Sequence, residues 1–141
     1  MKILVPLDGS DNANRALDFV IANIATLKEI PQILLLNVQW KVAVDNVKLF
    51  INQETIDDYY REQGMAALQQ ARTALDKANL PYQYHISIGI PAEAIVQYAN
   101  EQNVEQIVMS KQGQSDLQAM LLGSVVSKVL QLADCPVLLI K

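Results

Sequence analysis

The sequence predicts an α/β fold: a doubly wound, open parallel sheet of five strands with helices on both faces. Short apolar runs typical of buried strands alternate along the chain with amphipathic segments typical of helices, in the order βαβαβαβαβ. Crossovers between parallel strands are nearly always right-handed, which favours the doubly wound topology. A barrel of this kind needs more strands than the chain supplies.

The first strand and helix are predicted near the N-terminus. Residues 2–7 form a nearly continuous apolar run that stops at Asp8, as a strand buried on both faces does. Apolar residues then recur three and four positions apart over residues 13–27, which indicates a helix. Ser10 is a suitable N-cap for this helix.

The second strand is predicted over residues 33–38 and the second helix from Glu54 onward, with Asn79 and Pro81 ending it. Residues 40–53, between them, lack a clear pattern. They are expected to form a flap, a short extra helix or a contact surface.

The C-terminal half completes the alternation. Strands are expected over residues 82–88, 106–109 and 136–140. Pro91 suits the first position of a helix between the first two of these strands, and Gly123 and Ser124 open the last helix.

Composition limits the class of protein. A chain of 141 residues predicts one domain spanning residues 1–141, and a net charge of −4 disfavours nucleic acid as a partner. Cys135 is the single cysteine, which favours a reducing compartment. The chain contains neither a signal-peptide core nor an apolar run long enough for a membrane span, so a cytoplasmic location is expected.

Ligands of open parallel sheets bind beyond the carboxyl ends of the strands, where the strand order reverses. Asp8, Val38, Gly89 and Ser110 are expected at that edge. Asp8 has two readings, a turn aspartate that caps the first helix or a ligand contact.

The stretch from Ser110 to Ser124 is the strongest candidate for a phosphate site. Its glycines allow close approach of the backbone to a phosphate, and the N–H groups at a helix N-terminus attract anions without added positive charge. The alternative is that Gly113 serves a turn, Gly123 close packing, and Ser124 only a cap.

The order and spacing of several fragments resemble the universal stress protein family over nearly the whole chain. These fragments are Ile3-Leu4-Val5-Pro6-Leu7-Asp8-Gly9-Ser10, Gly89-Ile90-Pro91-Ala92-Glu93-Ala94-Ile95, Ile107-Val108-Met109, Leu122-Gly123-Ser124-Val125 and Ala133-Asp134-Cys135-Pro136-Val137-Leu138-Leu139-Ile140. The resemblance implies the adenine nucleotide α-hydrolase-like fold with strand order 3-2-1-4-5. It also implies a homodimer and, in the nucleotide-binding members, an ATP site.

The nucleotide motif implied by the resemblance is Gly, two residues, Gly, nine residues, Gly, then Ser or Thr. Gly113, Gly123 and Ser124 match it, and Ser110 replaces the first glycine. This serine lowers affinity if the backbone there needs a positive φ or lies against the phosphates. Otherwise its hydroxyl is available to donate to a phosphate.

By the same resemblance, Asp8 lies near the adenine or ribose, and Val38 offers adenine an apolar wall and backbone hydrogen bonds. Lys111 either meets a phosphate as a point charge or is a solvated lysine. The full predicted nucleotide site comprises Pro6, Leu7, Asp8, Val38, Met109, Ser110, Lys111, Gly113, Gly123, Ser124 and Val125.

The leading hypothesis is a small cytoplasmic stress-response protein that binds ATP, with or without magnesium, and is not an enzyme. No catalytic residue and no metal-ligand set is assigned; slow ATP hydrolysis or autophosphorylation on a serine is left open. The alternative is a nucleotide-free dimeric interaction protein that lost ATP binding through Ser110. Residues Pro136, Val137, Leu138, Leu139 and Ile140 form an apolar strand which, at a sheet edge, is suited to pair with a second copy.

Overall fold

The computed structural model describes residues 1–41, 52–112 and 122–141. Its strands are β1 (Lys2–Pro6), β2 (Gln32–Trp40), β3 (Tyr82–Gly89), β4 (Gln106–Ser110) and β5 (Val137–Ile140). Its helices are α1 (Asp11–Asn23), the short 3-10 helix η1 (Ile24–Thr26), α3 (Gln53–Lys77), α4 (Pro91–Glu101) and α5 (Ser124–Leu132).

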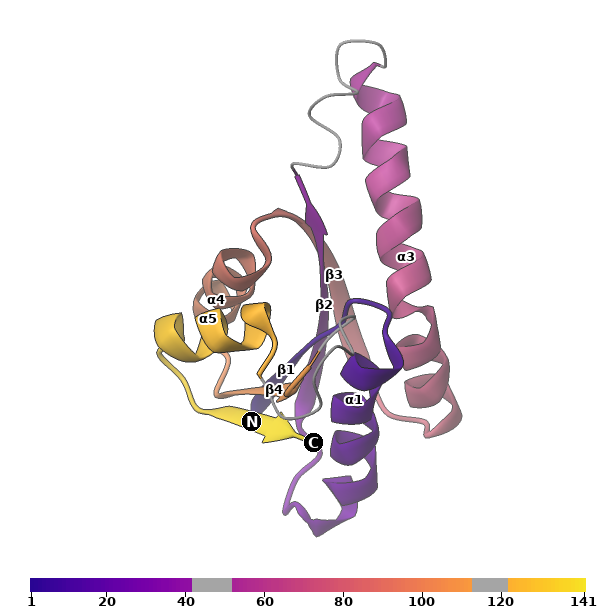
Figure 1. Cartoon of the computed structure of the whole chain (residues 1–141). Helices are drawn as coiled ribbons and strands as arrows, with labels where there is room; N and C mark the ends of the chain where they lie inside the picture. The colour runs from indigo at the N-terminus through magenta and orange to yellow at the C-terminus, as the bar shows by residue number, and fades with distance from the viewer. Residues whose placement is uncertain (42–51, 113–121) are drawn as a thin grey trace.

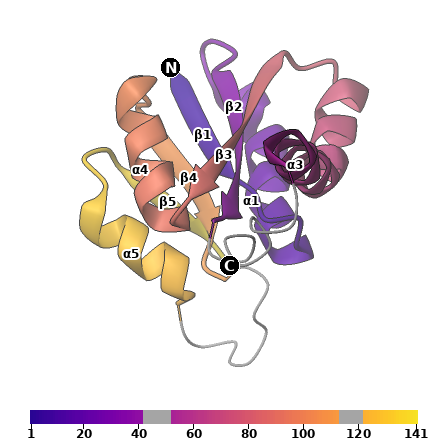
Figure 2. The ribbon, with the colours of Figure 1, turned by 90° about the horizontal axis from the view of Figure 1, so that it is seen from above.

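The five strands form one parallel sheet with the order β3-β2-β1-β4-β5. Helices α1 and α3 cover one face, and α4 and α5 cover the other (Figures 1 and 2). This arrangement confirms the predicted fold class and strand order. The N-terminal part of α3 extends beyond the edge of the sheet at which the strands end (Figure 1).

Alternating side chains of the central strands build two apolar cores, one on each face of the sheet. Under α1 and α3 the buried strand residues are Ile3, Val5, Ile33, Leu35 and Val108. Under α4 and α5 they are Leu4, Leu34, Leu36, Ile107 and Met109. Burial on both faces explains why these strands appear in the sequence as continuous apolar runs.

The edge strand β3 is more exposed than the central strands, which accounts for its weak pattern in the sequence. Helix α3 packs closely over it at Gly64. A Cβ placed on Gly64 would lie 2.7 Å from side-chain atoms of Ile86, so a side chain there would require Ile86 to shift. Glycine therefore permits the close approach of α3 to the sheet.

Three residues predicted to mark helix ends, Ser10, Asn79 and Pro91, are found where they were expected. The Ser10 hydroxyl accepts a hydrogen bond of 3.1 Å from the Ala13 N–H, so the predicted N-cap of α1 is confirmed. Pro91 opens α4 as expected. Asn79 has a positive φ of 53° just past α3, which confirms that it ends the helix.

Several predicted boundaries were wrong. Strand β1 ends at Pro6 rather than residue 7, and β2 continues from Val38 to Trp40 because β3 pairs alongside it. The helix after β2 begins at Gln53, where the Asn52 side chain accepts a 2.8 Å hydrogen bond from the Thr55 N–H.

Two further predictions at the C-terminal end need correction. Strand β5 begins at Val137, not Pro136. Ser124 is not the cap of α5, because Gly123 occupies the N-cap position and Ser124 is the first helical residue. At the ends of the unpatterned segment predicted over residues 40–53, Trp40 belongs to β2 and Gln53 to α3, and residues 42–51 lie outside the described residues. None of the described helices combines the length and apolar character needed to cross a bilayer.

Candidate functional site

A cavity of about 470 Å³ opens at the carboxyl ends of β1, β2 and β4, beside the first turns of α4 and α5. Strand β1 lies between β2 and β4 in the sheet, so the chain leaves it at the point where the strand order reverses. The volume falls within the roughly 300–1,000 Å³ range of small-molecule sites.

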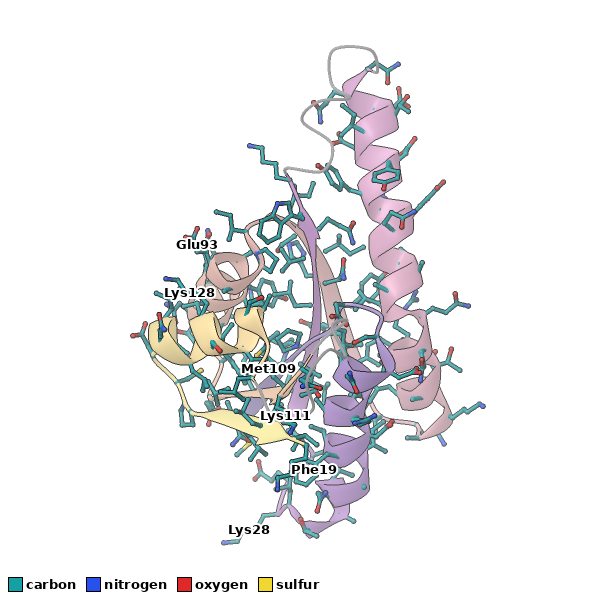
Figure 3. All side chains as sticks on the ribbon, in the orientation of Figure 1. Phe19, Lys28, Glu93, Met109, Lys111 and Lys128 are labelled. Atoms are coloured by element: carbon teal, nitrogen blue, oxygen red, sulfur yellow. The ribbon has the colours of Figure 1, made fainter. Side chains whose placement is uncertain are left out.

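Of the predicted site residues that the structure describes, the cavity brings together all except Lys111. The predicted residues that line it are Pro6, Leu7, Asp8, Val38, Met109, Ser110, Gly123, Ser124 and Val125. Figure 3 shows Met109 at the end of β4, on the side of α5. Gly113 lies outside the described residues.

Sequence reasoning missed a second group of lining residues. They are Ala13, Leu36, Asn37, Gln39, Trp40, Pro91, Ile95, Gln112 and Val126. For the end of β2 a signal was present: Val38, Gln39 and Trp40 alternate apolar, polar and apolar, as a strand does. The remaining residues of this group reach the cavity through the packing of segments that are distant in the sequence, which no local pattern indicates.

The end of β1 leaves backbone groups of β2 facing the cavity. The Leu7 N–H donates a 2.8 Å hydrogen bond to the Leu36 carbonyl oxygen, the last contact of this kind between the two strands. Backbone groups of a strand point to alternate sides, so Val38, two residues further, directs its N–H and C=O the same way as Leu36. Beyond Leu7 the chain has turned away, and those groups face the cavity region.

A buried side-chain amide, that of Asn37, holds the chain in place where it leaves β1. Asn37 is only 3% exposed, and its Nδ2 donates a 2.8 Å hydrogen bond to the Leu7 carbonyl oxygen. Its Oδ1 accepts a 2.6 Å hydrogen bond from Gln39 Nε2. The Nδ2 bond therefore ties the chain that leaves β1 to β2, and the Oδ1 bond, within β2, orients the Asn37 amide for it.

The turn after β1 places Asp8 at the rim of the cavity. Asp8 Oδ1 accepts hydrogen bonds from the N–H and the hydroxyl of Ser10, so Asp8 is a turn aspartate and Ser10, not Asp8, caps α1. Gly9 has a φ of +86°, and a Cβ there would lie 3.1 Å from the Ala67 Cα. The turn needs glycine for conformation and for space.

Ser110 lies at the end of β4, on the side of the cavity opposite to the end of β2. It is 6% exposed and ends β4, and it is not one of the described residues with a positive φ. The strain that a serine would suffer in a left-handed conformation therefore does not arise. The Gln112 N–H approaches its hydroxyl at 3.5 Å.

Backbone hydrogen bonds connect β4, β5 and the start of α5. The Lys111 N–H donates to the Ile140 carbonyl oxygen at 2.9 Å, and the Gly123 N–H donates to the Lys111 carbonyl oxygen at 2.9 Å. The N-terminus of α5 is thereby brought to the end of β4. Lys111 itself is not among the residues that line the cavity, and Figure 3 shows it beyond the end of β4.

The described lining of the cavity carries little charge. Asp8 is its single charged side chain, and within residues 1–41, 52–112 and 122–141 no cluster of three or more His, Cys, Asp or Glu could hold a metal ion. Affinity for an anion here would rest on backbone N–H groups and the N-terminus of α5. Burial raises the pKa of Tyr98 and of Cys135, neither of which lines the cavity.

Comparisons of the sequence and of the structure with known proteins all point to one family. The model of the universal stress protein family matches residues 1–141. Universal stress protein MJ0531 of Methanocaldococcus jannaschii is 32% identical over 146 residues, covering 99% of this chain and 81% of the relative. The solved structure of protein MJ0577, from the same organism, superposes with a TM-score of 0.84 at 29% identity, covering 99% of this chain and 94% of that one.

Two solved structures of the same fold contain adenine nucleotides. A universal stress protein in complex with cAMP has a TM-score of 0.72 at 21% identity and covers all of this chain and 97% of its own. The universal stress protein from Archaeoglobus fulgidus in complex with dAMP has a TM-score of 0.69 at 22% identity, with 100% and 98% covered. At these identities the likeness is one of fold.

Proposed function

The chain belongs to the universal stress protein family, and from this premise we propose that it is a small stress-response protein that binds an adenine nucleotide in the cavity between β1, β2 and β4. The observation that carries the proposal is the convergence on one cavity of backbone groups at Val38 and of the α5 N-terminus. Universal stress proteins of this fold hold cAMP or dAMP, which supports the ligand class.

In this proposal the base binds at the β2 side of the cavity. The N–H and C=O of Val38 provide a donor and an acceptor for the edge of the adenine ring. Apolar side chains such as Leu36 and Ile95 surround that position. Asp8, at the rim, is placed to accept hydrogen bonds from ribose hydroxyls.

The phosphates bind at the other side, beside Ser110 and the first turn of α5. The first amide groups of a helix lack partners within the helix, and the dipole of the helix favours negative charge at this end. Gly123 and Ser124 lie there. We propose ATP, with or without magnesium, as the physiological nucleotide, with the phosphate contacts completed through Gly113.

We propose binding rather than catalysis as the activity. Activation of a water molecule needs a positioned base, and the described lining offers only Asp8, whose Oδ1 is engaged by Ser10. A cytoplasmic location is part of the proposal, since Cys135 is a free thiol.

The proposed partner is a second copy of the chain, paired through β5. This strand is at the edge of the sheet, and its four residues are each half-buried. The exposed Phe19 projects from α1 beside it (Figure 3), which adds apolar surface to the same edge. Edge strands of this kind pair readily with another chain.

Calorimetric titration with ATP, in the presence and absence of magnesium, tests the nucleotide proposal. We expect saturable heat with one nucleotide per chain. Absence of heat with ATP, AMP and cAMP would reject the proposed function.

Sedimentation across the micromolar range tests the dimer. The carbonyl oxygens of Pro136 and Ile140 accept from the N–H groups of Ile107 in β4 and of Lys111 just after it, so the N–H of Leu139 points away from β4. We expect a dimer for the wild type and a monomer for Leu139→Pro, which removes that outward N–H. A wild-type protein that sediments as a monomer throughout the range would reject the partner.

A further inference from the structure

Trp40, the single tryptophan of the chain, lines the cavity at the end of β2. We propose that its indole ring is the stacking platform for the base, so that recognition is led by the base and an uncharged nucleoside binds nearly as tightly as a nucleotide. This inference rests on the proposed function, because it concerns the same cavity. It assigns a specificity-determining residue and a wider ligand class, purine nucleosides.

The pairing of β2 with β3 sets the position of the indole. Side chains alternate along a strand, so Trp40 points to the same face as Leu36 and Val38, which pack toward α4. Its neighbour across the register is Gly89, which places no side chain on that face. The indole therefore has room beside Pro91 and Ile95, which line the same cavity.

The distance along the strand suits a base held at Val38. Residues two apart on a strand are separated by roughly 6.5 Å. A purine whose edge is bonded to the Val38 backbone extends far enough to bring its ring against a side chain two residues further on. Trp40 is 48% exposed, so a large part of the indole surface is available to cover such a ring.

The chemistry of the described lining also favours the base over the phosphates. Apolar side chains predominate, and the one charged side chain, Asp8, is negative and would repel a phosphate rather than attract it. Burial of the base against apolar and aromatic groups is then the main source of affinity. Loss of a stacking aromatic typically weakens base binding by about 5- to 150-fold.

The test compares the wild type with Trp40→Leu and Trp40→Phe by calorimetry, using adenosine, AMP, ATP and, as a control without a base, ribose 5-phosphate. We expect the dissociation constant of adenosine to lie within about tenfold of that of AMP. Ribose 5-phosphate should not bind measurably. Trp40→Leu should lower the affinity for adenosine and for AMP by about 5- to 150-fold, and Trp40→Phe should lower it by less.

The intrinsic fluorescence of the wild type gives an independent readout, because Trp40 is the only indole. We expect adenosine to change its intensity in a saturable manner. This measurement decides the question even where Trp40→Leu does not fold.

The outcomes separate the two proposals. Three results would overturn this inference and leave the proposed function standing. The first is an affinity for AMP that is unchanged in Trp40→Leu, and the second is binding of AMP without binding of adenosine. The third is indole fluorescence that does not change when adenosine binds. A wild type that binds none of the three adenine compounds overturns both.

Discussion

The N–H of Gly123 donates a 2.9 Å hydrogen bond to the carbonyl oxygen of Lys111, which joins the start of α5 to the end of β4. The bond brings the amide groups at the N-terminus of α5 to the cavity. It does so with backbone groups alone, while the Lys111 side chain is not among the groups that line the cavity. The proposed phosphate end of the site therefore depends on the geometry of the main chain.

We expect Gly123→Val to lower nucleotide affinity at least tenfold more than Gly123→Ala does. Gly123 has φ −62° and ψ 154°, which other residues adopt, so the backbone tolerates both changes. Alanine and valine are similarly poor N-caps, so the difference between them reports the bulk of the side chain in the cavity. Calorimetry with ATP measures it, and equal affinities for the two variants would contradict the placement of the phosphates.

Ser110→Gly should change ATP affinity by no more than a few-fold. Ser110 has an ordinary strand conformation, so the serine imposes no backbone strain that glycine would relieve. Glycine inside a strand should instead cost about 0.5–1 kcal/mol of stability relative to Ser110→Ala.

This variant also decides between the two functions considered for the chain. Binding that is absent in the wild type and appears in Ser110→Gly would identify a nucleotide-free protein with a degenerate site. That result would reject the proposed function.

Asn37→Ala should destabilise the protein by about 1–3 kcal/mol, because it removes the donor to a buried carbonyl. The lost bond is the 2.8 Å contact from Asn37 Nδ2 to the Leu7 carbonyl oxygen. Urea denaturation measures the change. Gln39→Ala is the matched control, since Gln39 is half-buried and its Nε2 donates to Asn37 Oδ1 within β2. If Gln39→Ala lowers the free energy of unfolding as much as Asn37→Ala does, the bond from Asn37 to Leu7 is not the source of the stability.

Cys135 should react slowly with alkylating reagents at neutral pH. Burial raises the pKa of its thiol and Asp134 adds to the rise, although backbone hydrogen bonds at Cys135 and Ile107 oppose it. The reactive thiolate therefore forms at higher pH in the folded chain than in the unfolded chain.

The same shift has a consequence for stability. Above the pKa of the unfolded thiol, the unfolded chain loses its proton first, so this group should lower stability as the pH rises. Alkylation rates in buffer and in urea, followed over a pH series, measure the difference. Identical pH profiles in the two conditions would contradict it.

The sequence predicted those features that depend on neighbouring residues. Ser10 and Pro91 mark helix starts through local backbone chemistry, and both were located correctly. The apolar runs of β1 and β2 indicated a parallel sheet because burial on both faces leaves no polar positions.

The features that were missed depend on contacts between distant segments. Trp40 belongs to β2 because β3 pairs with it, and Asn37 faces the cavity region because it bonds to Leu7. The alternation of Val38, Gln39 and Trp40 indicates a strand but not the strand that pairs with it, and no local pattern encodes the bond from Asn37 to Leu7. The position of Lys111 depends likewise on its bonds to Ile140 and Gly123.

Titration of the isotopically labelled protein with AMP, followed in proton–nitrogen correlation spectra, tests the central claim most directly, because it reports both binding and location. The account predicts saturable shifts of the amide signals of Val38, Ser110 and Ser124 and of the single indole signal of Trp40. Spectra that do not change at saturating AMP, or shifts confined to the exposed edge of β3, would contradict it.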